Sequence, residues 1–168
     1  MRYLVAAVIL LALLGCGYHF PGKSGTLPGG VQSLYVPLFV NKTAEPQLEN
    51  LLSNDVSQVF SRSGRVQQVE TLQQAEAILE GVIRSYSTKA VAYDQQDDIS
   101  EYRSTVVVDA ALRQTADGRL LWQGQISWDD EYLAADDKIF QEDLEREAME
   151  EISLRIAEEL LARMLDDF

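Results

Sequence analysis

The sequence predicts an α/β (α+β) domain in which a β-α-β unit is followed by an antiparallel meander and a C-terminal helix. Apolar residues recur at helical intervals over residues 48–60 and again over residues 138–165. Between these segments, residues 105–113 and 119–129 alternate apolar and polar side chains on either side of an Asp-Gly pair, which is typical of an antiparallel hairpin. These three observations define the fold class.

The β-α-β unit begins with residues 33–40, which are rich in aromatic and β-branched side chains and predict a strand. Pro37 has no N–H to donate, so we place it at a sheet edge or a bulge. Thr43 is the expected N-cap of the following helix, with Pro46 in its first turn. Gly64 is the expected left-handed residue that ends this helix.

Two further strands are predicted before the hairpin. Residues 66–69 predict a short strand. Residues 75–86 fit a helix or a strand in their first half, and the Gly-Val-Ile at 81–83 with the later Thr and Tyr favours a strand. A β-α-β crossover makes its two strands parallel, with a right-handed connection. Residues 94–100 are polar and acidic and predict a loop.

The hairpin turns at Asp117 and Gly118, and each of its strands has one apolar and one largely polar face. This pattern is expected of an antiparallel sheet that is covered on one side only. Trp122 and Trp128 fall on the apolar face and are predicted to be core residues. The polar face includes Arg113, Gln123, Gln125 and Ser127.

The last helix is predicted over residues 138–165. At 1.5 Å per residue it is about 42 Å long, roughly the length of a 13-residue strand. It is therefore long enough to lie along the hairpin and cover it. Its apolar stripe is Ile139, Phe140, Leu144, Ala148, Ile152, Ile156, Leu160, Leu161 and Leu165.

The composition excludes several classes of function. The chain has 14 basic and 27 acidic residues, a formal net charge of -13, whereas nucleic-acid binding needs a concentration of Lys and Arg. A single Cys excludes an intrachain disulfide, a Cys-rich zinc site and an iron–sulfur site, and a single His excludes a His-paired metal site. No cofactor and no metal is implied, and a binding or structural role is favoured over catalysis.

The first fifteen residues predict a signal peptide. A charged start precedes an apolar run of 11 residues, 4–14, whereas a membrane-spanning helix needs about 20. The sequence Leu-Leu-Gly-Cys at 13–16 resembles the bacterial lipobox, in which the Cys is lipidated and becomes the first residue of the mature chain. Cys16 is therefore the predicted lipidation site, and the alternative is a free Cys that packs in a core.

Lipidation of Cys16 would anchor the protein to a membrane, because several acyl chains bind stably where one binds only marginally. Gly17 is compatible with export to the outer membrane. Residues 16–32 combine the lipidated Cys with a Gly- and Pro-rich tether, since 17–32 hold five Gly and two Pro. Residues 33–168 are then expected to form a single globular α/β domain.

Six short strings follow one another along the chain. They are LLGCGYHF at 13–20, VPLFVNKT at 36–43, PQLE at 46–49, AEAILEGVI at 75–83, EYR at 101–103 and GRLLW at 118–122. In this order and spacing they resemble the lipopolysaccharide-assembly lipoproteins, the LptE family of Gram-negative bacteria. The resemblance spans essentially the whole mature chain.

The resemblance implies a small mixed sheet with two helices packed on one face. It also implies a lipid-anchored, non-enzymatic outer-membrane protein that sits as a plug inside a large β-barrel partner of the LptD type. That pair inserts lipopolysaccharide into the outer leaflet. Two alternatives from other classes remain open: a periplasm-facing accessory lipoprotein of another transport or envelope complex, and a lipoprotein hydrolase that uses carboxylates.

Direct binding of lipopolysaccharide would need cations, because the ligand is anionic. Five cations lie on the predicted meander strands or at their ends, and they become candidate contacts if they gather near one edge of the sheet. The alternative is a set of scattered solubilising charges. The five are Arg84, Lys89, Arg103, Arg113 and Arg119.

Other polar residues predict no site. His19 lies close to Cys16 and is expected to be a tether residue. The acidic loop at 94–98 lacks the spacing, the Gly and the terminal Glu of an EF-hand, so a solvated loop is expected. Carboxylates are so abundant over residues 129–137 that they do not specify an acid/base pair.

Overall fold

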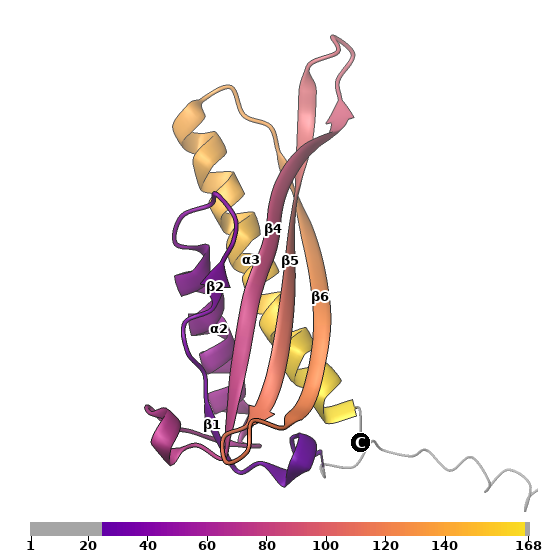
Figure 1. The fold of residues 1–168 in the computed structure, drawn as a ribbon. Helices are drawn as coiled ribbons and strands as arrows, with labels where there is room; N and C mark the ends of the chain where they lie inside the picture. Colours follow the sequence, from indigo (N-terminus) through magenta and orange to yellow (C-terminus); the bar gives the residue numbers. More distant parts are fainter. Residues whose placement is uncertain (1–24, 167–168) are drawn as a thin grey trace, which may run out of the picture.

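The computed structural model describes residues 25–166 of the chain, in which a mixed sheet is covered on one face by two helices (Figure 1). The strands run in the order β3-β1-β4-β5-β6, with β2 also paired to β4. The elements are η2 (Pro28–Gly30), β1 (Ser33–Tyr35), β2 (Val40–Asn41), α2 (Leu48–Ser63), β3 (Gln67–Gln68), η3 (Leu72–Gln74), β4 (Ala77–Tyr93), β5 (Ile99–Gln114), β6 (Leu120–Leu133) and α3 (Lys138–Asp166). The predicted fold class is confirmed.

The β-α-β unit has the expected parallel arrangement, but its first strand is interrupted. β1 and β2 pair separately with β4, through Leu34 opposite Ala77 and Val40 opposite Val82. Pro37 lies between the two short strands, because a residue without an N–H cannot continue the ladder. The predicted single strand over 33–40 is therefore two strands.

The start of α2 differs from the prediction that Thr43 caps it. Thr43 instead builds a turn: its N–H and hydroxyl donate to Asn41 Oδ1 at 2.9 and 2.7 Å, and its Oγ1 accepts from the Glu45 N–H at 3.1 Å. Gln47 then adopts a left-handed backbone, with φ of 66°, and the helix begins at Leu48. The hydroxyl is occupied in this turn, and Pro46 precedes the helix. The predicted left-handed end at Gly64 is confirmed, with φ of 64°.

The meander is antiparallel as predicted, and Gly118 has the positive φ, 71°, that its turn requires. A bulge at Leu121 then shifts the register, since Leu112 pairs with Trp122 while Arg113 pairs with Leu120. Leu120 therefore lies on the face away from the helices and is 40% exposed. Leu121 instead packs against the core.

The two tryptophans of the hairpin have different environments. Trp122 is buried, as predicted, but Trp128 is 38% exposed, and its predicted core position is wrong. The first turns of α3 lie away from β6 in Figure 1, so this end of the strand has no helix over it. The same divergence leaves Ile139 72% and Phe140 56% exposed, although the sequence places both in the apolar stripe of this helix.

The core lies between the helices and the sheet. From Ala148 onward the predicted stripe of α3 packs into the core. Ile152, Ile156 and Leu160 are at 0% exposure, while Leu161 and Leu165 are partly buried against the core. Gly81 provides the space for Phe39, because a Cβ at this glycine would lie 2.2 Å from the ring.

Residues 25–32, which the sequence assigns to the tether, pack against this domain. Leu27 is 1% and Val31 6% exposed, and both belong to the core cluster. Gly29 lies against the side chain of Leu121, so the bulge in β6 and the segment around η2 fit together. The packed part of the chain therefore begins before Ser33.

Candidate functional site

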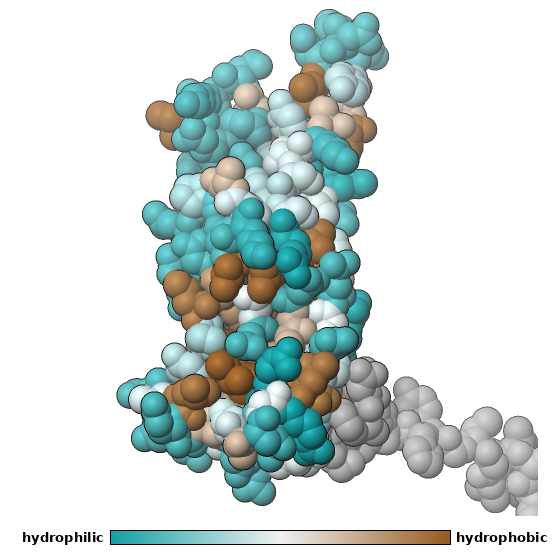
Figure 2. Space-filling view, in the orientation of Figure 1, coloured by the Kyte–Doolittle hydropathy of each residue, from teal (hydrophilic) through white to brown (hydrophobic). Residues whose placement is uncertain are grey.

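The candidate site is the face of β4, β5 and β6 that points away from the helices, which we call the open face. Strand alternation brings polar side chains of three strands together on it, because residues in register share a face. The surface over these strands is mostly hydrophilic, with separate hydrophobic patches (Figure 2). Gln123, Gln125 and Ser127, predicted to lie on the polar face, are exposed there.

Four of the five predicted cations lie on the open face, and Arg119 lies at its end beside the hairpin turn. Arg113 Nε is 3.3 Å from Glu80 Oε2, and Arg84 Nε is 2.6 Å from Asp109 Oδ2. Arg119 Nη2 donates to Gln114 Oε1 at 3.0 Å. The sheet therefore brings four of the predicted cations onto one surface, and it pairs Arg84, Arg103 and Arg113 with carboxylates.

Arg103 forms the largest of these charge clusters. It binds Glu131 through two nitrogens and lies 3.4 Å from Asp129. The hydrogen bond and the charge of Glu131 raise the pKa of Arg103. Lys89 is exposed and directly opposite Arg103 in the β4–β5 register, so two cations adjoin two acids here.

Asp109 is held by two neighbouring strands. Gln125 Nε2 on β6 donates to its Oδ1 at 2.8 Å, while Arg84 on β4 donates to its Oδ2. These two contacts, the hydrogen bond from Gln125 first, lower the pKa of Asp109. Sequence reasoning missed the four pairing acids, although each pair can be found once the strand register is known. They are Glu80, Asp109, Asp129 and Glu131.

The open face is hollowed between these charges, with a cavity of about 600 Å³ over β4, β5 and β6. Small residues line part of it, among them Gly81, Ala111 and Gly124, and charged residues stand beside them. Exposed ion pairs contribute little to stability, so these pairs chiefly set the charge pattern of the surface. The face offers guanidinium donors and amides to a polar partner, and its charges compensate one another.

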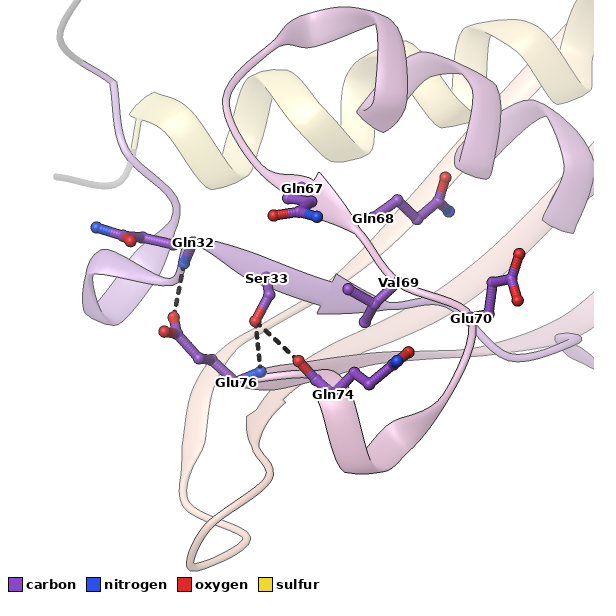
Figure 3. Close-up of a pocket in the computed structure, with 8 residues that line it drawn as sticks. All are labelled: Gln32, Ser33, Gln67, Gln68, Val69, Glu70, Gln74 and Glu76. Atoms are coloured by element: carbon purple, nitrogen blue, oxygen red, sulfur yellow. Dashed lines mark hydrogen bonds between the residues drawn. The ribbon is translucent and has the colours of Figure 1, made fainter.

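A second hollow, of about 570 Å³, lies beside β1 and β3 (Figure 3). Its polar groups hold the chain together: Gln32 N–H donates to Glu76 Oε2 at 2.8 Å, and Glu76 N–H donates to Ser33 Oγ at 3.0 Å. The Ser33 hydroxyl in turn donates to Gln74 O at 3.3 Å. These groups thus connect the segment before β4 to β1, and the hollow contains no nucleophile paired with a base.

A polar network joins α3 to the sheet on the helix side. The Tyr86 hydroxyl donates to the Glu145 carboxylate, and Thr88 Oγ1 donates to the same oxygen at 3.2 Å. Burial, together with this hydrogen bond, raises the pKa of Tyr86 to about 12. Burial and the charge of Glu145 also raise the pKa of Glu45, which lies in the loop before α2. These groups connect elements of the fold.

We expect Glu45→Gln to stabilise the protein at pH 7. A raised carboxyl pKa means that the folded chain holds the proton more tightly than the unfolded chain, so ionisation at neutral pH costs stability. The gain should be below about 1 kcal/mol, because solvent screens a partly exposed group. Thermal unfolding at pH 7 and at pH 4 tests this: the advantage should shrink at the lower pH. An equal difference at both pH values would contradict the assignment.

Two further acidic residues, Asp94 and Asp137, also have structural contacts. Asp94 Oδ1 accepts the N–H groups of Gln96 and Asp98, at 2.8 and 3.0 Å, and so shapes the β4–β5 turn. Asp137 Oδ1 accepts the Phe140 N–H at 2.9 Å at the start of α3. Over residues 25–166, no group of three or more His, Cys, Asp or Glu is arranged to hold a metal ion.

Cys16 and His19 lie outside the described residues, so the predicted lipidation site rests on the sequence. Within residues 25–166, no helix combines the length and the apolar content needed to cross a membrane.

Comparison with known proteins identifies the family. The family model for lipopolysaccharide assembly, LptE, matches residues 31–164. No curated protein matches the sequence significantly.

Solved structures of lipoproteins share the fold. Lipoprotein B of Nitrosomonas europaea has a TM-score of 0.60 at 17% identity, over 86% of this chain and 88% of that one. Rare lipoprotein B of Shewanella oneidensis has a TM-score of 0.55 at 15% identity, over 79% and 93%. A lipoprotein of Caulobacter crescentus has a TM-score of 0.56 at 14% identity, over 76% and 87%. With the family match over most of the folded domain, this chain belongs to the LptE family of lipopolysaccharide-assembly proteins.

Proposed function

We propose that this protein is a non-enzymatic lipoprotein, anchored to the outer membrane through Cys16, that binds and plugs a β-barrel protein of the LptD type. In this role it aids the insertion of lipopolysaccharide into the outer leaflet. The family match over residues 31–164 is the observation that carries the proposal. The open face supports it, because a polar and charge-compensated surface suits the polar interior of a membrane barrel.

The charge pairs of the open face also lower the cost of covering it. An unpaired charge that loses its water is expensive, whereas a paired and hydrogen-bonded one costs less. Arg113 with Glu80, and Arg84 with Asp109, enter such a contact already paired. The partner therefore need not supply a counter-charge for each of these residues.

We place direct contact with lipopolysaccharide on the same surface. Arg84, Lys89, Arg103, Arg113 and Arg119 remain the candidate contacts, since an anionic headgroup needs donors that carry positive charge. The most suitable position is beside Lys89 and Arg103, which face each other across β4 and β5. A phosphate there would compete with Glu131 and Asp129 for the guanidinium of Arg103.

Photo-crosslinkers at Arg113, Gln123 or Ser127 should capture one large outer-membrane β-barrel protein in cells. These positions lie on the open face, which the partner is proposed to cover. The matched control is Ile126, the neighbour of Ser127, which is fully buried and should react only within the chain. Single alanine substitutions at the open-face positions, which remove the side chain and keep the backbone N–H, should weaken assembly only mildly, since one polar contact contributes about 1 kcal/mol.

The crosslinked adducts distinguish the barrel plug from the alternative hypothesis, an accessory lipoprotein of another envelope complex. A barrel adduct from the open-face probes supports the plug. Absence of a barrel adduct from all three open-face positions, with normal expression of the lipoprotein, would contradict it and favour an accessory lipoprotein of another envelope complex.

A further inference from the structure

The free edge of β6 carries backbone groups that no other strand uses. In the described part of the chain, β6 pairs only with β5, at the end of the sheet, over 14 residues. Strands in globular proteins average about 5–6 residues, so this edge is long. A strand edge with unpaired N–H and C=O groups can template the addition of another strand.

The β5–β6 ladder shows which backbone groups point outward. Gln114 N–H donates to Arg119 O at 2.9 Å at the start of the hairpin, and above the bulge Leu112 is opposite Trp122. The backbone N–H and C=O groups of alternate residues point to opposite edges of a strand. Those of Trp122 and of every second residue as far as Tyr132 therefore point toward β5. The backbone N–H and C=O groups of Gln123 and of every second residue as far as Leu133 point away from β5, toward the free edge. Arg163 of α3 confirms this orientation, since its Nη1 donates to the Gln125 carbonyl at 3.1 Å.

Beyond Gln125, no other strand of the described residues pairs with this edge. Among residues 25–166, no side chain hydrogen bonds to the outward backbone groups of Ser127, Asp129 or Glu131. Trp128 and Leu133, at 38% and 62% exposure, flank the same stretch with apolar surface. The first turns of α3 lie away from it, as Figure 1 shows.

We propose that the edge of β6 from Ser127 to Leu133 binds an extended, basic segment of a partner protein as an added strand. The acidic charge of β6 indicates a basic partner. Asp129, Asp130 and Glu131 follow one another, and the strand contains no basic residue. Like charges directly opposite on paired strands are destabilising, so pairing with a second copy of β6 is disfavoured. The net charge of -13 opposes self-association further.

The alternation of β6 specifies the side chains of the added strand. Asp129 and Glu131 project on the open face, where Arg103 already binds them from β5. Asp130 projects on the helix side, so a Lys or Arg of the partner strand is expected opposite it. An apolar side chain is expected beside Trp128, on the same face. The added strand would hydrogen bond to the backbone of Ser127, Asp129 and Glu131, as in other strand-addition complexes.

Amide hydrogen exchange on the full-length, lipidated protein tests the proposal. The exchange rates are measured once in the native assembly and once in the protein purified alone after the assembly is dissociated. The N–H groups of Ser127, Asp129 and Glu131 should exchange at least 100-fold more slowly in the assembly, because exchange requires their new hydrogen bonds to open. The N–H groups of Trp128 and Asp130 face β5 and act as the internal control. They are already bonded, and their exchange should change far less.

The outcomes separate this proposal from the proposed function. Edge protection in an assembly with a β-barrel protein supports both. A barrel partner with an edge that exchanges as in the isolated protein overturns the added strand and leaves the plug standing. Edge protection in an assembly with a different protein supports the added strand and contradicts the plug. An intact lipoprotein that purifies with no partner overturns both.

Two pairs of variants test the edge in cells. Ser127→Pro removes an outward N–H, which an edge strand tolerates, and it should lower the yield of co-purified partner at least tenfold, whereas Ser127→Ala should not. Asp130→Lys should lower that yield several-fold more than Asp130→Asn if the partner strand is basic. Melting temperatures near that of the parent protein would exclude unfolding as the cause. Normal partner yield from both Ser127→Pro and Asp130→Lys would overturn the proposal.

Discussion

Replacing Cys16 with serine is expected to abolish fatty-acid labelling of the protein and to leave an uncleaved or mislocalised precursor. A thiol is far more nucleophilic than a hydroxyl at neutral pH, and lipidation of the side chain requires that nucleophile. Metabolic labelling with a fatty acid in cells measures the effect directly. His19→Ala is the matched control, because His19 lies three residues away and is not expected to take part.

The fold of the domain should survive the Cys16→Ser substitution. The core described here is formed by residues from Leu27 onward, all of them C-terminal to the substitution. Purified parent and variant domains should therefore melt at the same temperature while differing completely in lipid label. Equal labelling of the serine variant would remove the lipoprotein assignment and with it the proposed anchor.

Ile152→Asp is expected to unfold the domain. Ile152 is fully buried within the core cluster on the face of α3 that covers the sheet. A carboxylate at this position loses its water without gaining a partner, which costs several kcal/mol. The whole free energy of unfolding of a domain is about 5–15 kcal/mol, so loss of the cooperative thermal transition is expected. Circular dichroism during heating gives the measurement.

Ile139→Asp is the matched control for this prediction. Ile139 belongs to the same helix, receives the same substitution and lies in the same sequence-predicted stripe, but it is 72% exposed. Substitutions on the surface usually change the free energy of unfolding by less than about 0.5 kcal/mol, so the control should melt like the parent. If Ile152→Asp also melts like the parent, the assigned packing face of α3 is wrong.

Sequence periodicity was sufficient for the two helices and the antiparallel hairpin of this protein, because each of these patterns arises within a single segment. The apolar repeat of α3 and the Asp-Gly turn at Gly118 need no knowledge of the rest of the chain. The family strings were likewise sufficient for the LptE assignment. For the site, the sequence predicted which cations lie on the meander. Alternation alone would place Arg84 and Lys89, five residues apart on β4, on opposite faces, and the register shift between Ile83 and Ser85 brings both to the open face.

Tertiary structure alone decided which of these residues are buried or paired. A stripe is buried only where another element lies opposite it, so Ile139 and Trp128 are exposed although their local pattern matches that of Ile152 and Trp122. The bulge at Leu121 similarly reverses the face of Leu120, because one extra residue shifts the alternation by one place.

The charge pairs of the open face could not be predicted from local sequence either, because they join residues that are far apart in the chain. The partner of Arg103 is Glu131, 28 residues away in the chain, and the partner of Arg113 is Glu80 on another strand. Such pairs depend on strand register, which the whole ladder sets, and no local sequence pattern contains it. The sequence by itself thus determined the two helices, the hairpin, the family and the set of cations. Strand register and helix placement decided which charges meet, which apolar residues are covered and which edge of the described sheet stays open.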